Sequence, residues 1–98
     1  MTISIGLIGL GGKDEAEDNL RIFAENKIKA CEVAYTYSVY LKELDAIRIG
    51  KLAKELDIEL SIHAPYFINL NAKEQEKRDA SKKRVLACCE SANHLQCK

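Results

Sequence analysis

One histidine, His63, stands where a predicted β-strand meets a turn. Leu60 and Ile62 alternate with the polar Ser61, which is the pattern of a strand with one buried face. Pro65 cannot donate a ladder hydrogen bond, so we expect the strand to end close to His63. A neutral imidazole is a common metal ligand, and parallel α/β folds collect functional groups at the carboxyl ends of strands. His63 is therefore either a metal ligand or an ordinary core or surface histidine.

A second candidate is Glu32, a carboxylate inside another predicted strand. A charged group there needs a partner or a ligand. The side chain is predicted either to point inward, near bound metal, or to pair with a neighbouring lysine.

The glycine-rich segment that follows the first predicted strand, residues 9–14, invites comparison with a dinucleotide-binding turn, with Glu32 some 20 residues further on. Asp14 stands where that motif needs a small third residue, and its charge would repel a pyrophosphate. We interpret the segment as a tight turn that uses the freedom of glycine.

Three weaker patterns have structural explanations that we favour. A tyrosine cluster could stack nucleobases, but we expect it to bury the second helix. A His-x-x-Cys spacing could share a metal, but it is more typical of a helix end followed by a strand. A basic run could touch phosphates, but it is expected on a solvated helix face. The residues are Tyr35, Tyr37 and Tyr40; His94 and Cys97; and Lys82, Lys83 and Arg84.

The elements that must position these residues alternate along the chain. Strands are predicted at 3–8, 30–35 and 60–62, and helices at 14–26, 39–56 and 74–95. Apolar residues at helical spacing include Leu44 in the second helix and Val85, Cys88 and Cys89 in the third. A βαβαβα order predicts parallel strands with right-handed crossovers, as in the first part of a barrel or of a doubly wound sheet.

Composition limits the classes of protein. The 98 residues suit one domain, and 47% hydrophobic with 31% charged residues is typical of a globular chain. The 15 basic and 15 acidic side chains cancel, so no global positive field argues for nucleic acid. The four cysteines form no CxxC pair, which favours a reduced, cytoplasmic protein. No segment predicts export or membrane insertion.

The stretch 60–70, Leu-Ser-Ile-His-Ala-Pro-Tyr-Phe-Ile-Asn-Leu, resembles the signature of the endonuclease IV family of apurinic/apyrimidinic endonucleases. That family belongs to the xylose-isomerase-like TIM barrels. The resemblance implies that His63 is a zinc ligand in a three-metal site that hydrolyses DNA 5′ to an abasic sugar. It also implies that Tyr66 approaches the DNA, whereas Asn69 matches a position that we interpret as structural.

The same resemblance implies that residues 1–98 are an incomplete, partial TIM (β/α) barrel of about three βα units. The family's other ligands lie on strands four to eight, so this segment holds no catalytic group beyond the metal ligand and is expected to be inactive alone. The segment 35–38, Tyr-Thr-Tyr-Ser, stands where the family often carries a basic residue that contacts DNA.

Two alternatives stay open. The complete barrel could be a sugar-phosphate isomerase or epimerase of the same superfamily, with one divalent metal that stabilises an enediolate. The chain could also be a non-catalytic module that self-associates to cover its sheet edges and apolar faces.

Overall fold

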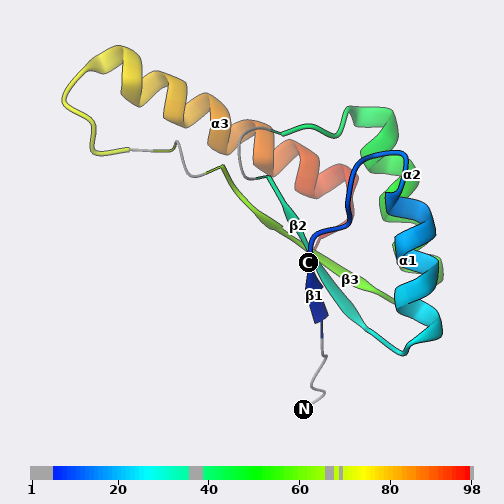
Figure 1. Ribbon diagram of the computed structural model, residues 1–98. Helices are drawn as coiled ribbons and strands as arrows, with labels where there is room; N and C mark the ends of the chain where they lie inside the picture. Colours follow the sequence, from blue (N-terminus) through cyan, green and yellow to red (C-terminus); the bar gives the residue numbers. More distant parts are fainter. Residues whose placement is uncertain (1–5, 36–38, 66–67, 69, 98) are drawn as a thin grey trace.

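Three strands and three helices alternate in the computed structural model, which describes residues 6–35, 39–65, 68 and 70–97 (Figure 1). The strands are β1 (Gly6–Ile8), β2 (Ala30–Ala34) and β3 (Glu59–His63), and they form one parallel sheet in the order β1-β2-β3. The helices are α1 (Ala16–Glu25), α2 (Glu43–Glu55) and α3 (Gln75–His94).

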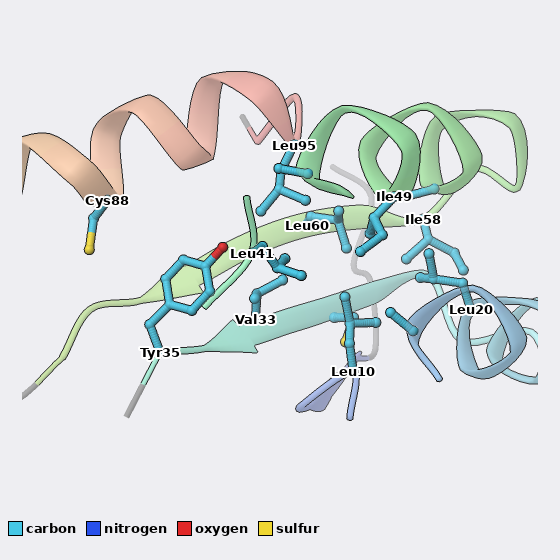
Figure 2. Packing of buried hydrophobic residues seen from close by; sticks show 14 residues of the cluster. Leu10, Leu20, Val33, Tyr35, Leu41, Ile49, Ile58, Leu60, Cys88 and Leu95 are labelled. Carbon is cyan, nitrogen blue, oxygen red and sulfur yellow. The ribbon is translucent and has the colours of Figure 1, made fainter. Parts of the chain in front are cut away.

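The order β1-β2-β3 follows the chain without a reversal, and right-handed crossovers then place all helices on one face of the sheet. Figure 2 shows the buried side chains between the strands and these helices. Cys31 and Val33 of β2 pair with Leu60 and Ile62 of β3 and share the covered face. The mixed α/β architecture, with its parallel strands, is that of a partial TIM barrel.

Each helix ends in the same way. One residue in the left-handed conformation follows the helix by two positions: Lys27 (φ 59°), Asp57 (φ 58°) and Gln96 (φ 58°). The next residue then donates its backbone N–H to a carbonyl five positions earlier, as in a Schellman motif. These bonds are Ile28 to Phe23 (2.9 Å), Ile58 to Ala53 (2.8 Å) and Cys97 to Ala92 (2.9 Å). After α1 and α2 this turn leads directly into the next strand.

Two expectations from helical periodicity need correction. Helix α2 begins at Glu43 rather than near residue 39, because Lys42 is still extended (ψ 164°), and Leu44 is 79% exposed. In α3, Cys89 is exposed, while Ser81 and Ser91 are buried beside Cys88. The buried face of α3 therefore includes two small polar side chains, Ser81 and Ser91. The spacing of apolar residues alone does not reveal such positions.

The first half of α3 and the described residues 70–74 before it extend beyond the sheet (Figure 1). This exposed part carries charged side chains, and Arg78 donates to the carbonyls of Ala72 (2.9 Å) and Lys73 (3.2 Å). In the described part of the chain no helix is long and apolar enough to cross a membrane.

Gly50 of α2 lies against the backbone of Leu95, the residue that caps the end of α3. A Cβ atom added at Gly50 would meet the backbone of Leu95 at 2.7 Å, and Leu95 is itself buried. The glycine therefore permits a close contact between the helices, at the expense of the helix propensity that alanine would supply.

We expect Gly50→Ala to destabilise the chain, although alanine alone would favour the helix by about 1 kcal/mol. Overpacking a fixed backbone contact typically costs about 1–3 kcal/mol. Urea unfolding followed by circular dichroism would measure the change, with the exposed Lys51→Ala as a control expected to stay within about 0.5 kcal/mol. A Gly50→Ala protein more stable than the wild type would contradict this packing.

Candidate functional site

His63 and Glu32 lie together on the face of the sheet that the helices leave open. Register places Glu32 opposite Ser61, and Ala34 opposite His63, so these four residues share one face. The backbone of each candidate is held by the ladder and its extensions: Tyr35 N–H donates to the His63 carbonyl (2.9 Å), and Gly9 N–H donates to the Glu32 carbonyl (2.7 Å). The strand positions of both residues are therefore fixed.

The two side chains contact each other directly. His63 Nδ1 lies 3.1 Å from Glu32 Oε1. The imidazole is 62% exposed and the carboxylate 33% exposed, so the ring is the more accessible group. The side chain of Glu32 thus lies on the open face of the sheet, and the partner that it contacts there is His63.

This pair can hold a proton or bind a cation. A carboxylate at Nδ1 leaves Nε2 as the ring nitrogen free to ligate, and metal-binding imidazoles are commonly held by a carboxylate in this way. Among residues 6–35, 39–65, 68 and 70–97, no group of three or more His, Cys, Asp or Glu side chains is placed to hold a metal ion. The described residues thus supply one exposed imidazole, with a carboxylate beside one of its two ring nitrogens.

Sequence reasoning did not single out Ser61. It is exposed on the open face, directly across from Glu32. The signal was present, because strict alternation along β3 puts Ser61 and His63 on the same side.

The glycine-rich turn is filled by groups of the chain itself. Gly9 and Gly11 have positive φ angles (91° and 78°), which explains the choice of glycine at both positions. The carboxylate of Glu15 accepts a hydrogen bond from Gly12 N–H (3.3 Å), and Asn19 donates to the Leu10 carbonyl (2.6 Å). The Gly12 N–H is thus bonded to a carboxylate of the chain itself, whose negative charge would repel a phosphate.

The described tyrosines pack against the fold. Tyr35 is fully buried among the core residues (Figure 2), and its hydroxyl lies 2.6 Å from Ser91 Oγ of α3. Its ring meets that of Tyr40 edge to face at 5.2 Å, and Tyr40 donates to the Gly11 carbonyl (3.1 Å). Tyr35 is inaccessible to a nucleobase, whereas Tyr37 lies outside the described residues.

The remaining candidates are dispersed. His94 is the last residue of α3, and Cys97 follows the Schellman turn, so this spacing marks a helix end. Lys82, Lys83 and Arg84 are exposed on α3. Tyr66, the residue expected to approach DNA, and Asn69 lie outside the described residues.

Two comparisons with known proteins bear on this site. The family model described as xylose isomerase-like TIM barrel matches residues 6–98. An uncharacterised protein of Methanocaldococcus jannaschii is 33% identical over 82 residues, which cover 81% of this chain and 29% of the relative. The chain thus spans less than a third of the length of the relative it matches.

Buried ionisable groups beside the site predict a loss of stability in alkali. Burial raises the pKa of Tyr35 to about 12, and burial followed by the charge of Glu32 raises the pKa of Cys31 to about 11. Above the ordinary pKa values, the unfolded chain releases protons that the native state keeps. Stability is therefore complete below about pH 9 and falls as the pH rises toward about 12, by up to about 1.4 kcal/mol per pH unit for each group.

Urea unfolding at pH 8, 10 and 11 would measure this slope. Tyr35→Phe should flatten it above pH 10, at a neutral-pH cost of about 1 kcal/mol for the lost bond to Ser91. Tyr40→Phe, which removes a less buried hydroxyl, is the matched control and should change the slope less. Equal alkaline slopes for the wild type and Tyr35→Phe would contradict the burial of this hydroxyl.

Proposed function

Because the chain belongs to the family of xylose isomerase-like TIM barrels, we propose that it is the amino-terminal segment of a zinc-dependent apurinic/apyrimidinic endonuclease. The observation that carries the proposal is the position of His63, on the open face at the carboxyl end of β3, where barrel enzymes build their sites. The similarity of residues 60–70 to the endonuclease IV signature supports the choice of reaction.

In this proposal His63 holds the metal and Tyr66 approaches the DNA. A zinc ion bound there would lower the pKa of a water molecule and stabilise the charge that develops on the phosphodiester. The chain itself supplies the rigid strand end that aims the imidazole and the neighbouring carboxylate of Glu32. The bond broken would be the phosphodiester 5′ to an abasic sugar.

The 98-residue segment is expected to be inactive by itself. One imidazole and one carboxylate are too few donors for a multinuclear site, and the missing ligands are assigned to later strands of a complete barrel. The relative of which this chain covers 29% has room for such strands.

An isomerase or epimerase of sugar phosphates is the alternative within the same family. The carboxylate of Glu32 beside His63 favours it, because a single divalent cation with mixed oxygen and nitrogen ligands suits enediolate chemistry. Such an enzyme would interconvert an aldose and a ketose phosphate and leave abasic DNA intact.

The test is incision of a duplex with one abasic site by a polypeptide that continues this chain through the remaining barrel strands. Cleavage on the 5′ side, lost in EDTA and restored by Zn²⁺, is the expected result. His63→Ala should lower the rate by at least about a hundredfold, since loss of a metal ligand removes the chemistry the metal supplies.

His94→Ala is the matched control, because it removes the other histidine of the chain, at the end of α3, and should keep full activity. The 98-residue chain should show no incision, and the duplex without an abasic site should stay intact. Zinc-independent cleavage, or turnover of a sugar phosphate without incision, would contradict the proposed function.

A further inference from the structure

We propose that Glu32 is a positioning residue for His63: its carboxylate holds the proton on Nδ1 and thereby commits Nε2 to the metal ion. The inference rests on the proposed function, since it takes His63 as a metal ligand. It goes further by giving Glu32 a role outside the set of direct ligands and by naming the ring atom that binds.

The first support is the contact itself. Nδ1 of His63 is the nitrogen that lies 3.1 Å from Glu32 Oε1. An ionised carboxylate can only accept, whereas a neutral imidazole has one N–H and one free lone pair. The carboxylate therefore favours the tautomer with its proton on Nδ1, and the lone pair is left on Nε2. Carboxylate and imidazole in this relation are a common outer shell of protein metal sites.

The second support is the depth of the two residues in the sheet. Ala34 is the residue paired with His63, and Glu32 precedes Ala34 by two positions. One such step is about 6–7 Å along a strand, so Glu32 approaches the ring from the amino-terminal side of the sheet. Functional groups of parallel barrels face the carboxyl ends. The carboxylate thus contacts the ring from the amino-terminal side of the sheet. Nε2 is then the ring nitrogen available at the carboxyl ends of the strands.

The third support is exposure and anchoring. The imidazole is 62% exposed and the carboxylate 33%, so an incoming ion meets the ring before it meets Glu32. Both backbones are held by hydrogen bonds across neighbouring strands, from Tyr35 N–H to the His63 carbonyl and from Gly9 N–H to the Glu32 carbonyl. The pair is therefore set by strand register.

The experiment is nuclear magnetic resonance of the ¹⁵N-labelled 98-residue chain, in which the imidazole nitrogens report the tautomer and the binding of Zn²⁺ alone. His94 is an internal reference in every spectrum. Glu32→Ala removes the acceptor, and Glu32→Gln keeps an acceptor without the charge. Glu55→Gln, an exposed residue of α2, removes the same charge elsewhere and is the control.

In the wild type and in Glu55→Gln, we expect the Nδ1–H tautomer at His63 and a Zn²⁺-dependent shift of Nε2. Glu32→Ala should move the ring toward the Nε2–H tautomer and weaken Zn²⁺ binding at His63 about tenfold or more, with a smaller loss for Glu32→Gln. Circular dichroism would show that the variants keep the fold, as expected for a residue of the open face.

Zinc bound at Nδ1, as for a direct Glu32 ligand, would overturn the inference. The same holds if Glu32→Ala leaves the tautomer and the Zn²⁺ affinity unchanged, or if Zn²⁺ does not reach His63. The proposed function fails separately: an extended protein that does not incise abasic DNA, while the Glu32 dependence of Zn²⁺ binding holds, would refute the nuclease and keep the positioning role.

Discussion

The parallel pairing of β2 with β3 is the constraint on which the rest of the molecule depends. It aligns Cys31 with Leu60 on one face, and these side chains join the core under the helices. The same register puts Glu32 and His63 on the other face, within contact distance. Because side chains alternate along a strand, a slip of one residue would exchange the core for the site. Core and site are therefore specified by one set of backbone hydrogen bonds.

The two faces of the sheet have different chemistry for a physical reason. On the covered face, residues such as Val33, Leu60 and Ile49 exclude water, and the buried hydroxyls of Tyr35 and Ser91 satisfy each other. On the open face, the carboxylate of Glu32 and the imidazole of His63 avoid the free-energy cost of burying a charged group, because water reaches both. The three βα units thus place the apolar core on one face of the sheet and the ionisable pair on the other.

Much of the fold could be predicted from the sequence, since alternation and helical spacing are local signals. Pro65 indicated the end of β3, and the βαβαβα order indicated parallel strands. The contact of Glu32 with His63 was not predicted, because the register that brings them together is a property of two strands and not of either one alone. The bond between Tyr35 and Ser91 and the approach of Gly50 to Leu95 join residues far apart in the chain, and no local pattern reveals such partners. The exposure of Leu44 was missed because periodicity does not fix where a helix starts.

The identical turns at the ends of α1, α2 and α3 have a consequence for how the polypeptide acquires its shape. The turns after α1 and α2 return the chain to the sheet within a few residues, so the loop between each of these helices and its next strand is short. Short loops close at low entropic cost. Parallel pairing of β1 with β2 and of β2 with β3, by contrast, joins residues such as Gly6 and Ala30, and pairing over such separations is slow. The short turns therefore keep each helix close to its strands while the sheet, the slower part of the fold to assemble, is completed.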